Sequence, residues 1–122
     1  MKIYTTCFTN LKNLPENIIA VAISRTVPYW YNGYRWLRLA PSRSILSDYH
    51  KFRNKDRYKE RFTDEILDLI DSDTLRTEME SFIQLGCTIA LVCYERSPKF
   101  CHRHLVADWL RGLGYEVEEW RN

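Results

Sequence analysis

The sequence has no apolar run long enough to cross a membrane, and no charged-then-apolar leader at its start. Glycine and proline are scarce, at four residues each, and there is no low-complexity segment, which argues against extensive disorder. A chain of 122 residues that is 45% hydrophobic can bury a real core. We therefore expect one soluble, cytoplasmic domain spanning residues 1–122, with no membrane partner.

Several motifs of well-characterised chemistry are also missing. No glycine-rich phosphate loop of the dinucleotide or P-loop kind is present. Tyrosine phosphatase loops have a cysteine, five intervening residues and then an arginine. Here the residue at that position after Cys93 is Lys99, and Arg103 lies ten positions after Cys93, so the spacing does not match. Zinc spacing is poor, since seven residues separate Cys93 from Cys101, and the adjacent Cys101 and His102 would point about 100° apart on a helix. We predict no metal and no cofactor.

Cysteine occurs at four positions, Cys7, Cys87, Cys93 and Cys101. In a secreted chain these could form two disulfides. In a reducing compartment, cysteines are more often core residues, ligands or reactive thiols. Because this chain can build a core without covalent links, we expect no structural disulfide.

The net charge of +2 conceals a strong asymmetry. Residues 35–61 carry nine of the 18 Lys and Arg residues, whereas the charged residues of segment 64–80 are all acidic except Arg76. A basic segment can attract phosphate backbones. It can equally be a solvated face or a partner for the acidic stretch, and the sequence leaves these alternatives open.

Hydrophobic patterning predicts an alternation of strands and helices. Strands are predicted over residues 2–8, 18–23, 88–92 and 115–120, the second and third as buried parallel strands. Helices are predicted from Ser44, from an N-cap at Thr63, from Asp73 with a stop at Gly86, and over residues 101–111. This order predicts an α/β fold, a small Rossmann-like single domain with a mostly parallel sheet and helices on both faces.

Polar or reactive side chains follow both buried strands. Arg25 follows the first, Cys93 and Glu95 follow the second, and Cys-His-Arg at residues 101–103 opens the last helix. In open α/β sheets, ligands bind outside the carboxyl ends of the strands, near helix N-termini. If the two strands are parallel neighbours, these residues meet in one cleft.

Three of these residues are candidates for catalysis. Cys101 lies at a helix N-terminus, where the partial positive charge favours a thiolate, so it is either a nucleophile or a polar wall. His102 can move a proton near neutral pH. Glu95 can act as a base or orient a partner.

The other three are candidates for binding an anionic or nucleotide-like ligand. Arg103 and Arg25 can donate charge-assisted hydrogen bonds to a phosphate or carboxylate at the helix N-terminus. Cys93 would lie beside them, although one cysteine after a strand is most often an ordinary buried residue.

The stretch LVCYERSPKFCHRHLVADWL resembles the signature of the domain of unknown function 488 family. In that signature an apolar strand ends in cysteine and glutamate, and Cys-His-Arg opens a helix after a variable linker. The matching positions here are Cys93, Glu95 and residues 101–103. Members also carry Asp-Val-Arg after an early strand. Here Ile-Ser-Arg stands there, so Arg25 corresponds but the aspartate does not, and Tyr58 corresponds to a recurring tyrosine.

The resemblance implies a compact α/β fold with these residues in one cleft, and it implies no agreed activity. Our first hypothesis is an enzyme acting on a nucleotide-like or phosphorylated substrate. One alternative is a nucleic-acid-binding accessory protein, in which the aromatic residues of segment 29–36 stack on bases while segment 35–61 follows phosphates. Another is a module that captures a small ligand without chemistry. The sequence predicts no oligomeric state.

Overall fold

The centre of the fold is a five-stranded sheet in which every neighbouring pair is parallel. The structure, a computed structural model, describes residues 2–83, 88–94 and 101–121. The strands are β1 (Lys2–Cys7), β2 (Ile18–Ala22), β3 (Tyr34–Arg35), β4 (Thr88–Cys93) and β5 (Glu116–Glu119). Their order across the sheet is β3-β2-β4-β1-β5. The predicted α/β fold is confirmed.

The helices lie between these strands along the chain. The α-helices are α1 (Arg43–Phe52), α2 (Lys55–Glu65), α3 (Ser72–Ile83) and α4 (His102–Gly112). Three short 3-10 helices complete the described part: η1 (Phe8–Asn13), η2 (Leu37–Leu39) and η3 (Leu67–Leu69). No helix among the described residues is both long and apolar enough to span a membrane.

One predicted helix start is wrong. Thr63 lies inside α2, which begins eight residues earlier, at Lys55. The side chain of Asn54 accepts a hydrogen bond from the backbone N–H of Arg57 and caps the helix there. Tyr58 and Phe62 lie four residues apart and are both buried, so this otherwise polar helix has one apolar face toward the core. The predicted stop at Gly86 lies outside the described residues.

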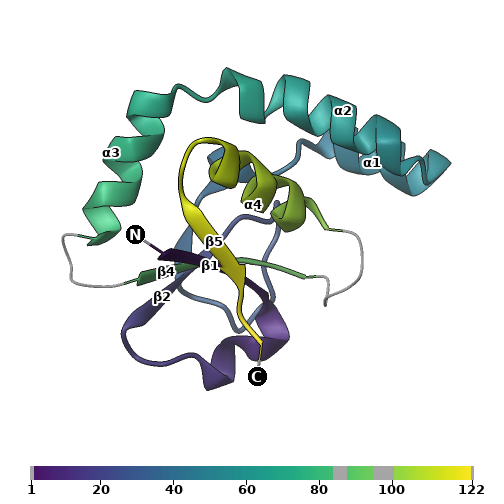
Figure 1. Cartoon of the computed structure of the whole chain (residues 1–122). Coiled ribbons are helices and arrows are strands. Elements are labelled where there is room, and N and C mark those ends of the chain that lie inside the picture. The colour runs from purple at the N-terminus through teal and green to yellow at the C-terminus, as the bar shows by residue number, and fades with distance from the viewer. Residues whose placement is uncertain (1, 84–87, 95–100, 122) are drawn as a thin grey trace.

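The two faces of the sheet are covered unequally. Alternate residues of the central strands, such as Val21 and Leu91, pack against the α-helices in the main core. On the opposite face, Ala22 and Val92 pack with Phe8 of η1 in a smaller cluster. Figure 1 shows α1–α4 gathered on one side and η1 on the other. Helices thus lie on both faces, but all the α-helices of the described chain share one.

The pairing of β2 with β4 positions the candidate site. Ala22 aligns with Val92, and the N–H of Ile23 donates to the carbonyl of Val92 at 3.0 Å. Both strands therefore end at the same edge. This confirms the adjacency that the sequence required, and it brings the residues after β2 and β4 together beneath the start of α4.

Candidate functional site

A cavity of about 300 Å³ opens at this edge of the sheet. Its walls come from the segments after β2 and β4, from the start of α4, and from α1 and α2. The lining residues are Ser24, Arg25, Thr26, Pro41, Leu46, Tyr49, His50, Arg53, Tyr58, Cys93, Tyr94, Cys101 and His102. Four of the six predicted site residues, Arg25, Cys93, Cys101 and His102, thus line this cavity, whereas Glu95 falls outside the described residues.

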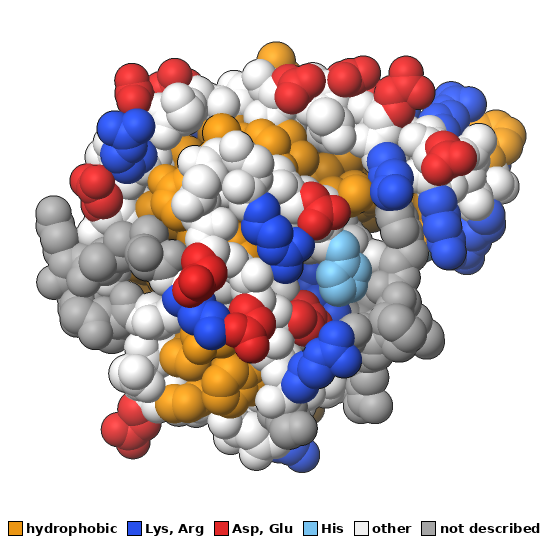
Figure 2. Space-filling view, in the orientation of Figure 1, with side chains coloured by type: hydrophobic (Ala, Val, Ile, Leu, Met, Phe, Trp, Pro, Cys, Tyr) orange, Lys and Arg blue, Asp and Glu red, His pale blue; other side chains and the backbone are white. Residues whose placement is uncertain are grey.

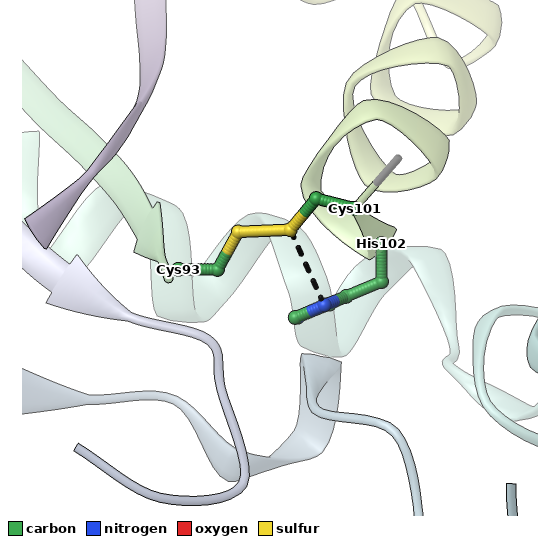
Figure 3. A group of neighbouring side chains, drawn as sticks. All are labelled: Cys93, Cys101 and His102. Carbon is green, nitrogen blue, oxygen red and sulfur yellow. Dashed lines mark hydrogen bonds between the residues drawn. A yellow bond between two sulfur atoms is a disulfide. The ribbon is translucent and has the colours of Figure 1, made fainter. Parts of the chain in front are cut away.

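Cys93 and Cys101 meet at the base of this cavity. Their Sγ atoms are joined as a disulfide across eight positions of sequence, with the Cα atoms 7.6 Å apart (Figure 3). The expectation of no disulfide is therefore wrong for this pair. The end of β4 and the start of α4 place both side chains in one buried spot, which composition could not indicate. Cys7 is a buried free thiol.

The imidazole of His102 lies against the same sulfurs and is buried. Its Nε2 donates to the carbonyl oxygen of Ile23 at 2.6 Å, so Nε2 carries the proton and Nδ1 has a free lone pair. Nδ1 lies 3.8 Å from Sγ of Cys101. Burial lowers the pKa of His102 to about 4, against the weaker raising effect of the Ile23 carbonyl. His102 is therefore neutral at pH 7.

The convergence of two adjacent residues has a local cause. Cys101 is the N-cap of α4 and has an extended backbone, with φ −154° and ψ 146°, whereas His102 is the first helical residue. The 100° offset between neighbours holds only when both are helical. The offset therefore does not separate the two side chains here, and the ligand atoms of Cys93, Cys101 and His102 all lie within 4.8 Å of one another.

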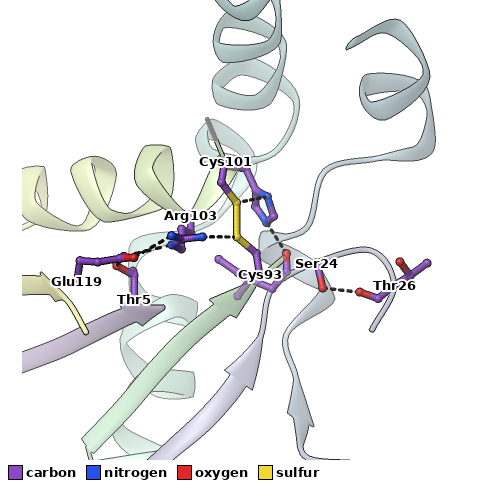
Figure 4. The surroundings of a disulfide bond; sticks show 9 residues. Thr5, Ser24, Thr26, Cys93, Cys101, Arg103 and Glu119 are labelled. Carbon is purple, nitrogen blue, oxygen red and sulfur yellow. Dashed lines mark hydrogen bonds and ion pairs between the residues drawn. A yellow bond between two sulfur atoms is a disulfide. The ribbon is translucent and has the colours of Figure 1, made fainter. Parts of the chain in front are cut away.

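Arg103 lies behind the sulfurs, outside the cavity lining, and its side chain is fully buried. Its Nε and Nη2 donate to the two carboxylate oxygens of Glu119 at 3.1 and 2.8 Å. Its Nη1 donates to Sγ of Cys93 at 3.1 Å (Figure 4). The hydroxyl of Thr5 also donates to Glu119, at 2.6 Å. The guanidinium predicted to bind a ligand anion is thus engaged by an internal carboxylate and a sulfur.

The charged residues on the cavity wall are basic. Arg25, Arg53 and His50 line it, and the lining residues that the structure describes include no Asp or Glu. The Nε of Arg25 donates to the carbonyl of Pro41 at 3.1 Å, which fixes the side chain at the wall. The guanidinium of Arg53 lies 5.5 Å from the ring centroid of Tyr49. The wall therefore favours a negatively charged group.

Comparison with known families identifies the chain. A model of the DUF488-N3a family, described as the active DUF488-N3 subclade, matches residues 4–114. The chain belongs to this DUF488 family. No curated protein and no solved structure gives a significant match.

The DUF488 match covers every described residue of the sulfur–histidine centre, by which we mean Cys93, Cys101 and His102. Glu119 lies beyond the match, although it holds Arg103. Sequence reasoning did not single out Glu119, which lies on the last strand. One signal was available: Arg103 lies three, four and seven residues before Val106, Ala107 and Leu110, on the buried stripe of α4. A buried arginine on such a stripe needs an anionic partner.

Proposed function

We propose that this DUF488 protein is a small enzyme that binds an anionic, nucleotide-like substrate in the cavity and acts on it with the sulfur–histidine centre. One observation carries the proposal: the centre lies on the wall of a cavity whose described charged residues are all basic. Clefts that combine reactive side chains with apolar walls and a few convergent polar groups are the usual form of small-molecule sites.

Arg25 and Arg53 are the proposed contacts for the anion. With its Nε bound to Pro41, Arg25 has two terminal NH₂ groups that make no hydrogen bond to any described residue. A guanidinium held in one orientation offers two parallel donors to a phosphate or carboxylate. Arg53 adds a second cation at the end of α1.

The remaining walls fit a flat ring. Tyr49, Tyr58 and Tyr94 line the cavity together with Leu46 and Pro41. Aromatic and aliphatic side chains of this kind bury the faces of a planar group. A ligand that combines a ring with a phosphate satisfies both parts of the cavity, and a nucleotide has this combination.

The centre needs reduction before it can act, because a disulfide leaves neither sulfur as a thiolate. Once reduced, Cys93 lies beside the guanidinium of Arg103, which favours the thiolate form, and Cys101 faces the lone pair of His102 Nδ1. Two sulfurs with different polar partners then lie at the base of the cavity.

Ligand binding can be tested on reduced protein by calorimetry with AMP, adenosine and inorganic phosphate. We expect AMP to bind more tightly than either fragment, and Arg25→Ala and Arg53→Ala each to weaken AMP binding roughly tenfold, since one charge-assisted hydrogen bond contributes about 1.5–3 kcal/mol. Arg76→Ala on α3, away from the cavity lining, is the matched control. Equal AMP affinity in all four proteins would contradict the proposal.

Catalysis is tested separately from binding. Reduced protein is incubated with a panel of nucleotides, denatured, and the small molecules are analysed by mass spectrometry. We expect a nucleotide to be converted by the wild type and recovered intact with Cys93→Ser and Cys101→Ser. Recovery of every bound nucleotide unchanged from the wild type would identify a binding module instead of an enzyme.

A polynucleotide is a second candidate ligand, favoured by the surface beside the cavity. Lys and Arg side chains gather at the end where α1 meets α2 (Figure 2), and Phe52 is 56% exposed there. The aromatic segment offers Trp30 at 50% exposure, but Trp36 is in the core. Binding of a single-stranded oligonucleotide should weaken steeply between 50 and 200 mM salt. Salt-independent binding would exclude this candidate.

A further inference from the structure

We propose that the reduced protein binds one Zn²⁺ ion through Sγ of Cys93, Sγ of Cys101 and Nδ1 of His102. This inference goes beyond the proposed function, because metal binding at these atoms does not require the cavity to accept a nucleotide. It rests on four features of the described structure: the ligand set, the orientation of the imidazole, the surrounding charges and the open side of the site.

The three ligand atoms have the right chemistry and lie close together, and reduction of the disulfide frees the two sulfurs to separate around an ion. Zinc prefers thiolate and imidazole ligands, at about 2.3 Å for sulfur and about 2.0–2.1 Å for nitrogen, so neighbouring ligands of a tetrahedral ion lie roughly 3.3–3.8 Å apart. Cys101 Sγ and His102 Nδ1 are already 3.8 Å apart, and all three atoms lie within 4.8 Å. The Cα atoms of Cys93 and Cys101, at 7.6 Å, leave room for an ion between the separated sulfurs.

The imidazole is held as a ligand. A metal-binding histidine almost always donates its other ring N–H to a carboxylate or a backbone carbonyl, which fixes the tautomer and the ring plane. His102 makes this contact, because its Nε2 donates to the Ile23 carbonyl at 2.6 Å. Nδ1 is consequently unprotonated and directed toward the sulfurs (Figure 3). The side chain of Phe62 packs against the ring, with centroids 5.5 Å apart.

The surrounding charges balance when the ion is bound. Cys93 and Cys101 are 1% and 6% exposed, so two thiolates here without a cation would be costly. One Zn²⁺ neutralises both. Arg103 adds no uncompensated positive charge, because Glu119 binds it through two hydrogen bonds. The Nη1 hydrogen bond to Cys93 Sγ then orients a ligating sulfur, as outer groups commonly do around zinc.

The site has three protein ligands and one open side. Cys93, Cys101 and His102 all line the cavity, so the fourth position of a tetrahedral ion faces its interior. Zinc sites with three protein ligands keep the fourth for water or substrate, and they are typically catalytic. A substrate anchored at Arg25 would share the cavity with that position.

Zinc binding requires the reduced state, and both the reduction step and the binding step balance in electrons and protons. Dithiothreitol reduces the Cys93–Cys101 disulfide by transferring two hydrogens to the sulfurs and becomes a cyclic disulfide itself. Zn²⁺ then replaces the thiol protons, releasing at most two protons per ion. His102 releases none, since its Nδ1 is already unprotonated.

The experiment compares reduced and oxidised wild-type protein. The chain is reduced with dithiothreitol in the presence of a chelator, and both reagents are removed by anaerobic gel filtration. Zn²⁺ is then titrated against a chromophoric chelator, and Co²⁺ is used in parallel as a spectroscopic probe. We expect one submicromolar Zn²⁺ per reduced chain, thiolate-to-cobalt charge-transfer bands with Co²⁺, and at least 100-fold weaker binding by the oxidised protein.

Variants assign the ligands. Cys93→Ser, Cys101→Ser and His102→Asn should each weaken Zn²⁺ binding at least tenfold, whereas Cys7→Ser, which removes the free buried thiol, should leave it unchanged. Equal Zn²⁺ affinity in reduced and oxidised wild-type protein overturns the inference without any mutation, so a variant that fails to fold does not weaken the test. Arg25→Ala should retain its Zn²⁺ affinity while binding AMP roughly tenfold more weakly, which separates failure of the metal site from failure of the proposed function.

Discussion

Nη1 of Arg103 donates a hydrogen bond to Sγ of Cys93 at 3.1 Å, from a guanidinium whose Nε and Nη2 bind Glu119. This arginine connects three elements, since Glu119 lies on β5, Arg103 on α4 and Cys93 at the end of β4. A buried cation needs a buried partner, and here the same cation also donates to a sulfur that we propose to be reactive once reduced. We therefore expect both the stability of the fold and the proposed chemistry of the centre to depend on this one side chain.

Removal of the carboxylate charge at Glu119 should destabilise the protein strongly. Glu119→Gln leaves Arg103 as a fully buried cation without an ionic partner, and breaking a buried pair in this way costs about 3–5 kcal/mol. Urea unfolding of the oxidised protein measures the loss. Glu118→Gln is the matched control on the same strand, because Glu118 pairs with Lys2 at the surface and should change the free energy of unfolding by less than about 1 kcal/mol. Similar losses in both variants would contradict this view of the Arg103–Glu119 pair.

The reduced, metal-free protein should show selective thiol reactivity. The guanidinium beside Cys93 favours its thiolate, whereas Cys7 Sγ contacts the hydroxyl of Thr9, which carries no charge. Iodoacetamide at pH 7 should therefore modify Cys93 roughly ten times faster than Cys7, as followed by peptide mass spectrometry. Arg103→Lys, which loses the fork that reaches both Glu119 and the sulfur, should slow modification of Cys93 and leave Cys7 unaffected. Equal rates at the two cysteines would argue against activation by Arg103.

Acid should weaken the fold through His102. Its pKa is about 4 in the folded state, against 6.5 for an ordinary histidine, mainly because the ring is buried. The unfolded chain therefore takes up a proton first as pH falls, so stability is complete above pH 6.5 and declines toward pH 4, by about 3 kcal/mol in all. Urea unfolding of metal-free oxidised protein at a series of pH values measures this. His102→Gln should flatten the profile over that window, and an unchanged slope would show that other groups cause it.

The location of the site was predictable because it follows from strand patterning. The runs at residues 18–23 and 88–92 are short and continuously apolar, a pattern typical of buried parallel strands. Parallel neighbours end at the same edge, so Arg25 and Cys93 had to lie near each other once β2 paired with β4. The short strand β3 was not predicted, since two residues carry no periodic signal.

The internal partners of the site were not predictable in the same way. The pairing of Arg103 with Glu119 depends on how β5 aligns with β1. The contact of His102 with Ile23 is made to a backbone carbonyl, and every residue has one, so the residue types do not predict it. The shared direction of Cys101 and His102 depends on where α4 begins, and helix boundaries shift by one or two residues between criteria. Local patterns thus located the centre, while tertiary contacts set the roles within it.

Arg53 combines a strained backbone with a place on the cavity wall. It ends α1 with φ 53° and ψ 30°, a left-handed conformation in which a side chain costs about 1–2 kcal/mol and glycine does not. Arg53→Gly should therefore stabilise the protein by about 0.5–1 kcal/mol, because the greater freedom of glycine in the unfolded chain offsets part of the gain. The same change should weaken AMP binding roughly tenfold through loss of the cation. Arg53→Ala keeps the strained Cβ and removes the charge, so it should lose the same affinity without gaining stability. If Arg53→Gly binds AMP as tightly as the wild type, Arg53 does not contribute to anion binding.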